Sequence, residues 1–453
     1  MGPIERRLAE TLERIGAVNP AINAIVSLRS EEAILADARA MDLRDPAGPL
    51  WGEPIAIKDM VQTKGVQSTQ GSPLFEGFVP ETDDTVSRRI RAAGAVVIGK
   101  TNTPEFGLGS HTVNPVFGPT RNPYDLTKSA GGSSGGAGAA VATSMLDIAD
   151  GSDMMGSLRN PAGWNNVYSL RPSWGLVTDG ARGDLYLHQL TTAGPMARTP
   201  AGLARLLDVL IGEDDDLVHP LARGWAAFSP GLTAASAGLT LGWLGDWDGA
   251  YPMEDDILSV CETGLGVLDG LGAAVKPVAA PIGSETLWRS WVALRSFAIS
   301  AKLHLLYADP AKRSALKPAA VTETLQGLNL SSSDIQRASE ARSEWFRIAM
   351  GLFETYDALV LPTAQVWPFP VEWTHPTRIN GTIMDTYHRW MEVVVPVSLI
   401  GLPAVTLPAG FGPNGLPMGI QVFGRPGSDQ MLLNLAEAYH CATHWPQERP
   451  PVL

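Results

Sequence analysis

The sequence predicts an α/β protein built around a large central sheet. Short apolar runs of strand length alternate with segments whose apolar residues recur at helical spacing, which is the pattern of α/β folds. The sequence contains no repeat and no low-complexity linker that would interrupt this alternation. The chain has 453 residues, of which 45% are apolar, so it can bury a sizeable core.

The first third of the chain follows this alternation. A short apolar strand delivers Lys58 and Asp59 at its end, and Gly94 ends a helix just before the next strand. A run of small residues after Gly136 predicts a helix that can pack closely. Helices are expected at 4–15, 33–43, 85–93 and 137–149, and strands at 54–57 and 95–98.

The rest of the chain continues the pattern. Residues 239–278 indicate a βαβ unit with Cys261 on the core face of its helix. Pro200 lies in the first turn of a helix, and Ser333 with Gln336 predicts a capping box. Strands are expected at 239–244, 273–278 and 357–362, and helices at 199–211, 257–268, 284–307 and 334–355.

One uncharged run, 393–411, is close to the length of a membrane span. It contains Pro396, Pro403 and Pro408, which would break a spanning helix. We therefore expect buried strands and turns there rather than a membrane segment.

Charge and cysteine content exclude several classes of partner. The formal net charge is −13, so direct binding to nucleic acid or to an anionic membrane surface is not expected. Two cysteines and scattered histidines provide neither a disulfide framework nor a metal site. The charged N-terminus lacks the apolar core of a secretory signal, which favours a cytoplasmic location.

The segment 131–161 contains the most informative motif. Two loops rich in glycine and serine, 131–136 and 151–157, flank a run of small residues. Glycine at this density lets the backbone approach a ligand closely and lets N–H groups point into a shared space. A serine between glycines is accessible. The segment is therefore either a nucleophile with an oxyanion site or a cradle for an anion.

Three motif matches are set aside. Residues 94–101 match a phosphate-binding loop, but their β-branched centre is typical of a strand. Residues 131–135 match a nucleophile elbow, but polar, turn-like residues precede them instead of a buried strand. Residues 314–317 match a serine–lysine motif without its companions, and they are interpreted as surface helix.

A serine–lysine pair remains as the source of chemistry. A serine needs a base to become a nucleophile at neutral pH, and Lys58 at the end of an apolar strand is a candidate. Burial can lower a lysine pKa by several units, which would supply the neutral amine. From local sequence alone, a surface ion pair of Lys58 with Asp59 or Glu53 is the simpler interpretation.

Three segments together resemble the catalytic segments of the amidase signature family: GEPIAIKD at 52–59, GGSSGG at 131–136 and GSDMMGSLRNPA at 151–162. The resemblance is strong over 45–210 and clear over 355–435. It implies one domain, 1–453, folded as a single large α/β/α sandwich with a mixed, twisted sheet. Within this domain, residues 45–210 would form the core that contains the catalytic segments. Residues 217–355 would form a more variable region that covers the pocket, and residues 356–440 would add further strands to the sheet. Further matches lie at 94–107, 117–123, 194–198, 401–403 and 415–421.

The resemblance also implies residue roles. Ser157 would be the nucleophile, Ser133 the bridging serine after a cis peptide bond, and Lys58 the buried neutral base. The oxyanion hole would use the backbone N–H groups of Met154, Met155, Gly156 and Ser157. Gly132, Ser134 and Asp153 would support the site, and Gly107, His111, Trp164, His375 and Arg378 are candidates for substrate binding.

The chain departs from the family pattern at three positions. Met155, Asn166 and Ser169 stand where the family commonly has glycine. If position 155 requires a positive φ, a methionine costs about 1–2 kcal/mol there. Its side chain would then have to find space, for example in the acyl pocket.

The implied activity is hydrolysis of the C–N bond of a small-molecule amide through an acyl-enzyme, with release of ammonia or an amine. This chemistry needs no metal and no cofactor, and a homodimer is compatible with it. Aliphatic, aryl and urea-type amides all stay open as substrates. Two alternatives also stay open: the glutaminase subunit of a tRNA-dependent amidotransferase, and a binding homologue whose oxyanion loop Met155 impairs.

Overall fold

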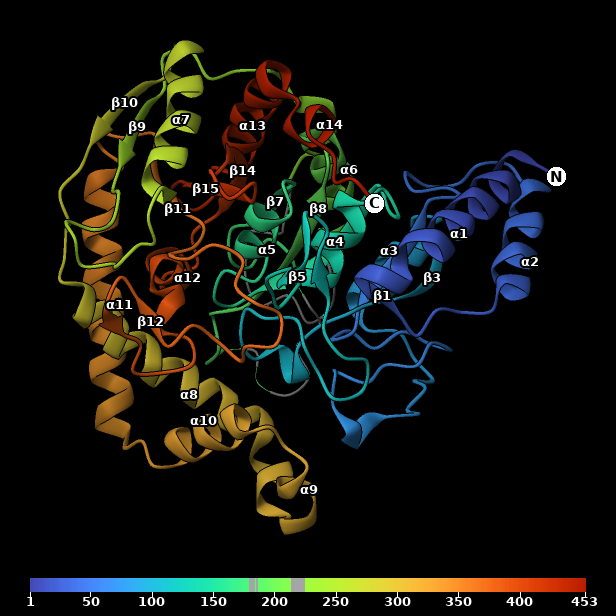
Figure 1. Ribbon diagram of the computed structural model, residues 1–453, viewed down its shortest axis with the longest axis horizontal. Coiled ribbons are helices and arrows are strands. Elements are labelled where there is room, and N and C mark those ends of the chain that lie inside the picture. Colours follow the sequence, from blue (N-terminus) through green and yellow to red (C-terminus); the bar gives the residue numbers. More distant parts are fainter. Residues whose placement is uncertain (179–183, 185, 213–224) are drawn as a thin grey trace.

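A mixed sheet of eight strands forms the centre of the computed structural model, which describes residues 1–178, 184, 186–212 and 225–453 (Figure 1). Helices cover the sheet in an α/β/α arrangement, which confirms the predicted fold class. In spatial order the strands are β10 (Ala274–Pro277), β9 (Thr240–Trp243), β11 (Ala358–Pro362), β15 (Pro417–Phe423), β14 (Ala404–Phe411), β7 (Tyr168–Arg171), β8 (Thr192–Ala197) and β6 (Ile148–Asp153).

The sheet mixes parallel and antiparallel pairs. Strands β9, β10 and β11 are parallel neighbours, and the helix α7 (Ile257–Gly270) connects the first two, as the βαβ pattern predicts. The other pairs are antiparallel. Cys261 of α7 is fully buried, as expected. The other helices that pack on this sheet are α4 (Gly135–Ala142), α5 (Arg159–Trp164), α6 (Pro200–Leu210) and α13 (Asp429–Thr443).

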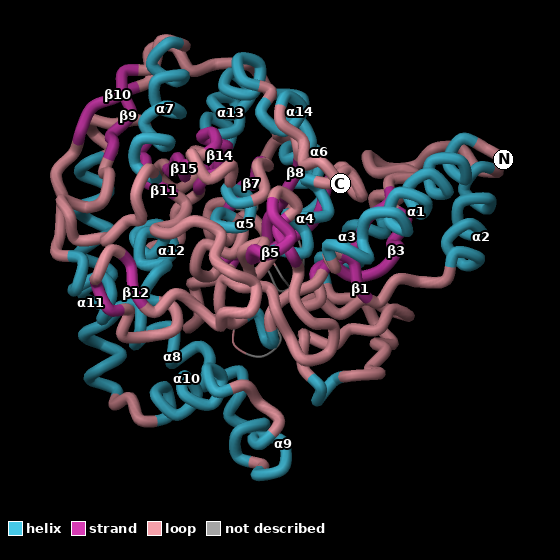
Figure 2. Tube along the Cα trace, viewed as in Figure 1, coloured by secondary structure: helices cyan, strands magenta, loops and turns pink. Residues whose placement is uncertain are grey.

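A second sheet of three strands lies beside the N-terminal helices, at the right of Figures 1 and 2. Its order is β1 (Ile25–Val26), β3 (Val96–Thr101) and β2 (Pro54–Lys58). Residues 96–101 are fully buried strand, which confirms that 94–101 is not a phosphate loop. The helices of this region are α1 (Pro3–Ile22), α2 (Glu31–Asp42) and α3 (Thr85–Ala92).

The helices α8 (Ser284–Ala308), α9 (Pro310–Ser314), α10 (Pro318–Leu328) and α11 (Ser332–Leu352) form the left and lower edges of the molecule (Figure 1). The capping box of α11 consists of Ser331 and Asp334, so the prediction of Ser333 with Gln336 was wrong by two positions. In the motif at 314–317, Ser314 ends the exposed helix α9, as the interpretation as surface helix predicts. Lys317 is the cap residue before α10, and its amine donates to the Leu108 carbonyl at 2.6 Å, so this end of the motif is not free on the surface.

Two element predictions need correction. The small-residue helix ends at Ala142, the chain turns over 143–147, and only the last two residues of the run 137–149 belong to the edge strand β6. The run 393–411 begins with the 3₁₀ helix η5 (Arg389–Val394) and α12 (Val395–Leu399) before β14. Within the described ranges, none of the helices is long and apolar enough to cross a membrane.

Small elements complete the chain. They are the hairpins β4 (Arg121–Asn122) with β5 (Asp125–Ser129) and β12 (Arg378–Ile379) with β13 (Thr382–Ile383), the 3₁₀ helices η1 (Pro73–Phe75), η2 (Glu105–Gly107) and η4 (Ser229–Gly231), and α14 (Trp445–Glu448). The division into 45–210, 217–355 and 356–440 stays a prediction, and residues 217–224 of the expected pocket cover lie outside the described residues.

Candidate active site

The amine of Lys58 is buried among three serine hydroxyls. Lys58 ends β2 with 1% of its surface exposed. Its Nζ donates to Ser133 Oγ and to Ser134 Oγ, each at 2.8 Å, and to Ser152 Oγ at 3.1 Å. The amine therefore contacts neutral hydroxyl groups and makes none of the surface ion pairs that the local sequence favoured.

The two carboxylates considered for that ion pair have other partners. Glu53 pairs with Arg7 at 2.6 Å and also with Arg205. Asp59 accepts hydrogen bonds from the backbone N–H and the hydroxyl of Thr69, at 3.0 and 2.5 Å. Neither carboxylate neutralises the amine of Lys58 directly.

Burial lowers the pKa of Lys58 to about 7, although the nearby carboxylates of Asp150 and Asp153 raise it. Removal from water penalises the ammonium form, since the surrounding hydroxyls solvate a charge less well than bulk water does. The lowered pKa favours the neutral amine near neutral pH, the form that can accept a proton.

The loop before α4 presents Ser133 to this amine. The Gly132–Ser133 peptide bond is cis. A side chain at Gly132 would place its Cβ 2.9 Å from Thr112 Oγ1, so only glycine fits there. A Cβ on Gly107 would lie 3.6 Å from Ser133 Oγ, which places Gly107 next to the candidate bridging serine.

The loop after β6 carries Ser157, which keeps 7% of its surface exposed. The backbone N–H of Ser134 donates to the Ser157 carbonyl at 3.2 Å, so the two serine loops are joined directly. Gly156 has φ +75°, and a Cβ there would lie 2.9 Å from Val394, so glycine is required on both grounds.

Asp153 holds the Ser157 loop in shape. Its carboxylate is fully buried and pairs with Arg159 at 2.9 Å and with Arg171 at 3.1 Å. It also accepts the backbone N–H groups of Gly156 at 2.9 Å and Leu158 at 3.2 Å. The two guanidinium groups hold the pKa of Asp153 well below its usual range, despite its burial, so this carboxylate stays ionised.

This arrangement corrects the expected oxyanion hole at one position. The N–H of Gly156 is already donated to Asp153, so it is not directed at a substrate oxygen. The N–H groups of Met154, Met155 and Ser157 stay as the candidate donors. A hole with fewer donors can still act, because single donors of this kind contribute about 3–4 kcal/mol to the transition state.

The Met155 side chain lies in the main core. The residue is absent from the positive-φ residues of the described chain, and its side chain is 2% exposed and packs in the main core. The cost considered for a methionine at this position therefore does not arise. The neighbouring Met154 is partly buried, and its sulfur lies 3.5 Å from Arg295 Nη1.

Asn166 and Ser169 each donate hydrogen bonds to backbone carbonyls of other segments. Asn166 has φ +56°, a conformation that asparagine tolerates, and its amide donates to the carbonyls of Trp445 and Arg449. Ser169 Oγ donates to the Leu158 carbonyl at 3.1 Å, directly after Ser157 in the chain. Asn166 thus ties the C-terminal segment to the sheet, whereas Ser169 supports the loop.

The candidate substrate residues are dispersed. His111 is buried between Ser129 and the Val371 carbonyl, and burial lowers its pKa to about 4. Trp164 has no exposed surface and stacks on Trp390, so it belongs to the core and not to a pocket wall. His375 is half-buried, and Arg378 is exposed on the hairpin β12–β13, where it bonds the Gly381 carbonyl.

Two residues near the amine were missed. Asp150 accepts the backbone N–H of Lys58 at 3.0 Å, and Ser152 contributes the third hydroxyl. Both lie on β6, two residues apart, so they face the same side of the strand. The alternation in IADGSD could have indicated them, but its first residues were predicted to be helix.

Comparisons with known proteins give the family of the chain. A family model described as Amidase matches residues 6–433. This chain belongs to the amidase signature family. It is 33% identical to the A subunit of the glutamyl-tRNA(Gln) amidotransferase of Dehalococcoides mccartyi (strain ATCC BAA-2266 / KCTC 15142 / 195), over 97% of this chain and 93% of that protein.

Two further comparisons involve relatives that are named as acylamidases. This chain is 30% identical to an acylamidase of Rhodococcus erythropolis, over 97% of its length and 92% of that protein. A solved bacterial aryl acylamidase of the same family superposes with a TM-score of 0.91 at 27% identity, over 99% of this chain and 96% of that one. The protein is therefore an amide-hydrolysing enzyme of this family.

Proposed function

We propose that the enzyme cleaves the C–N bond of a small-molecule amide through an acyl-enzyme on Ser157. The observation that carries the proposal is the buried Lys58 amine, 2.8 Å from the hydroxyl of Ser133, in a loop joined to Ser157. A neutral amine in contact with a serine hydroxyl is a base in position to activate a nucleophile.

In the proposed reaction, protons move along one chain of groups. Lys58 accepts the proton of Ser133 while Ser133 accepts that of Ser157, whose oxygen attacks the amide carbonyl. The tetrahedral oxyanion is stabilised by the backbone N–H groups of Met154, Met155 and Ser157. The relay then returns a proton to the leaving nitrogen, and water, activated by the same groups, releases the acid from Ser157.

Two variants and one probe test the mechanism. Ser157→Ala and Lys58→Ala are each expected to lower amide hydrolysis to background while the circular dichroism spectrum stays native. A fluorophosphonate should label Ser157, located by peptide mass spectrometry, and the label should disappear in Ser157→Ala. Ser343→Ala, an exposed serine on α11, is the matched control and should keep both label and activity. Turnover by Ser157→Ala would contradict the assignment.

A second candidate function is the glutaminase subunit of a tRNA-dependent amidotransferase. It is favoured by the 33% identity to a protein named as the A subunit of a glutamyl-tRNA(Gln) amidotransferase. This function requires a partner chain. The acylamidase likeness, with a TM-score of 0.91 to a solved aryl acylamidase, favours independent hydrolysis instead. Assays of the purified chain distinguish the two functions. Hydrolysis of aryl or aliphatic amides without a partner supports the first function. Glutaminase activity that appears only with partner proteins supports the second.

A further inference from the structure

Two partly exposed residues, Gly107 and Met60, lie next to the hydroxyl of Ser133. On another side of this hydroxyl, the amine of Lys58 approaches to 2.8 Å and is itself buried. The backbone of the Ser133 loop is buried as well. Gly107 and Met60 therefore mark a side from which a group in solution can approach Ser133.

The space in front of Gly107 is large enough for a carbon atom. A Cβ placed on Gly107 would lie 3.6 Å from Ser133 Oγ and 3.6 Å from both Sδ and Cε of Met60. These are ordinary van der Waals distances, and no described atom outside residues 106–108 comes closer. Gly107 has φ +70°, a conformation that favours glycine, so the chain itself leaves this space without a side chain.

The proposed reaction requires the leaving nitrogen of the amide to lie beside this space. Ser133 returns a proton to that nitrogen, so the nitrogen must come within about 2.7–3.2 Å of Ser133 Oγ. A carbon bonded to the nitrogen then lies about 3.5–4 Å from the same oxygen. The space in front of Gly107 is at this distance from Ser133 Oγ. It therefore fits the first carbon of a substituent on the leaving nitrogen.

The ring of Tyr387 lies two residues further along the same loop. A Cβ placed on Gly109, which is also partly exposed, would lie 3.5 Å from Cε2 of this ring. The thioether of Met60 and the ring of Tyr387 are both apolar surfaces. A methionine side chain adapts its shape to different apolar groups, and an aromatic ring buries a large area against hydrocarbon. The walls on this side of the site therefore favour an apolar substituent.

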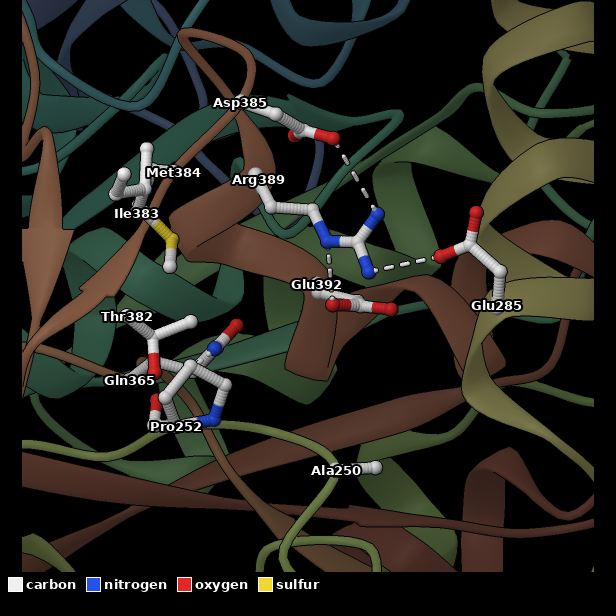
Figure 3. Close-up of a pocket in the computed structure, with 10 residues that line it drawn as sticks. All are labelled: Ala250, Pro252, Glu285, Gln365, Thr382, Ile383, Met384, Asp385, Arg389 and Glu392. Atoms are coloured by element: carbon white, nitrogen blue, oxygen red, sulfur yellow. Dashed lines mark hydrogen bonds and ion pairs between the residues drawn. The ribbon is translucent and has the colours of Figure 1, made fainter.

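Tyr387 is fixed in position by two sets of contacts. Arg295 Nη2 donates to its hydroxyl at 2.9 Å, and the hydroxyl donates to Glu323 Oε1. Arg295 and Glu323 form a buried ion pair at 2.9 Å, so their charges compensate each other. Two residues after Tyr387, Arg389 pairs with Glu285 of α8 at 3.0 Å (Figure 3). The ring is therefore held against the loop by partners that add no net charge through Arg295 and Glu323.

We propose that Gly107, Met60 and Tyr387 form a subsite for an uncharged, apolar substituent on the leaving nitrogen, so that the enzyme prefers secondary amides to primary amides. This proposal rests on the proposed acyl-enzyme mechanism and adds the class of its leaving group, an alkylamine or arylamine in place of ammonia. The C–N bond breaks as the Ser157 ester forms, the amine leaves with the proton from Ser133, and water then converts the ester to the acid.

Two isomeric amides test the proposal. N-butylacetamide and hexanamide contain the same atoms, but the longer hydrocarbon chain is on the nitrogen in the first and on the carbonyl carbon in the second. We expect kcat/KM, measured from the acid released, to be about tenfold or more higher for N-butylacetamide. It should exceed the value for N-methylacetamide by a similar factor, because each buried methylene contributes about fourfold.

Substitutions in the subsite should change this preference. Met60→Ala and Tyr387→Ala should each lower the ratio of kcat/KM for N-butylacetamide over hexanamide by about fivefold, chiefly through KM, because apolar contact with the butyl group is lost. Met60→Leu and Tyr387→Phe should keep the ratio. The methyl group of Gly107→Ala would fill the space and should lower the ratio by about tenfold or more. Met41→Ala, at a partly exposed methionine on α2, is the matched control and should leave the ratio unchanged.

Fluorophosphonate labelling of Ser157 separates failure of the subsite from failure of the mechanism. If Ser157 is labelled but N-butylacetamide is not hydrolysed, or is hydrolysed no faster than hexanamide, the subsite proposal is wrong and the acyl-enzyme mechanism stands. An unchanged ratio in both Met60→Ala and Tyr387→Ala would also overturn the subsite, even if Gly107→Ala does not fold. Absence of labelling together with absence of amide hydrolysis would overturn the mechanism and the subsite with it.

Discussion

Asp150 Oδ1 accepts a hydrogen bond at 3.0 Å from the backbone N–H of Lys58 and thereby joins the two sheets of the enzyme. Lys58 ends the three-stranded sheet, and Asp150 lies on the edge strand β6 of the eight-stranded one. The same strand carries Ser152 and leads into the Ser157 loop. The candidate site thus lies where the sheets meet, and a buried carboxylate at this junction adjusts the charge state of the amine.

The first prediction concerns the pH dependence of catalysis. With Lys58 as the base, kcat/KM should rise as pH increases through about 7, because the pKa of Lys58 is lowered to that value and the neutral amine is the active form. Asp150→Asn keeps an oxygen acceptor but removes the charge that raises this pKa. The rising limb should therefore move to lower pH, measured with a chromogenic anilide over about pH 5–9. A limb that stays in place or moves to higher pH would count against Lys58 as the base.

The second prediction separates two serines that contact the same amine. Ser133 and Ser134 each lie 2.8 Å from Lys58 Nζ, but only Ser133 is proposed to carry a proton. Ser133→Ala should lower kcat by about 10³-fold, whereas Ser134→Ala should cost about tenfold through a lost hydrogen bond. Steady-state kinetics of both variants, each checked for native thermal melting, would settle the roles. Equal losses would mean that Ser133 only orients the amine.

Local sequence patterns predicted those parts of the fold and site that depend on neighbours along the chain. Lys58 follows a short apolar strand, and the serines lie between glycines, so their accessibility could be inferred. Asp150 and Ser152 were missed because 137–149 was predicted to be helix and 151–157 a loop, whereas 148–153 form the strand β6. Only the pairing of β6 with β8 decides between helix, loop and strand.

The aromatic side chains show the same limit. Trp164 was a candidate for the pocket because aromatic side chains can line one, yet its ring lies in the core between Phe369 and Trp390. Those partners are more than 200 residues away in sequence, and no local pattern specifies them. Met155 was likewise suspected of filling the acyl pocket, because no local pattern shows that its side chain packs in the main core.

The third prediction concerns thiol reactivity. Cys261 is fully buried, and burial raises the pKa of its thiol far above the usual range, whereas Cys441 is exposed on α13. Iodoacetamide should therefore modify Cys441 in the native enzyme and reach Cys261 only in denaturant. Peptide mass spectrometry gives the sites, and Cys441→Ser should remove all native labelling without loss of activity. Native labelling of Cys261 would show that α7 opens readily.

The last prediction tests what Met155 does. Its side chain packs in the main core, so Met155→Ala should lower the free energy of unfolding by about 2–5 kcal/mol, while Met155→Leu should cost less than about 1.5 kcal/mol. Because its backbone φ is not positive, the loop that carries Ser157 does not need glycine at 155. Both variants should therefore keep kcat within about tenfold at temperatures where they are folded, in contrast to Ser157→Ala. Urea unfolding and amide hydrolysis, measured on the same preparations, provide the two readouts. A large rise in kcat for Met155→Ala, with stability unchanged, would show instead that the methionine side chain obstructs the acyl site.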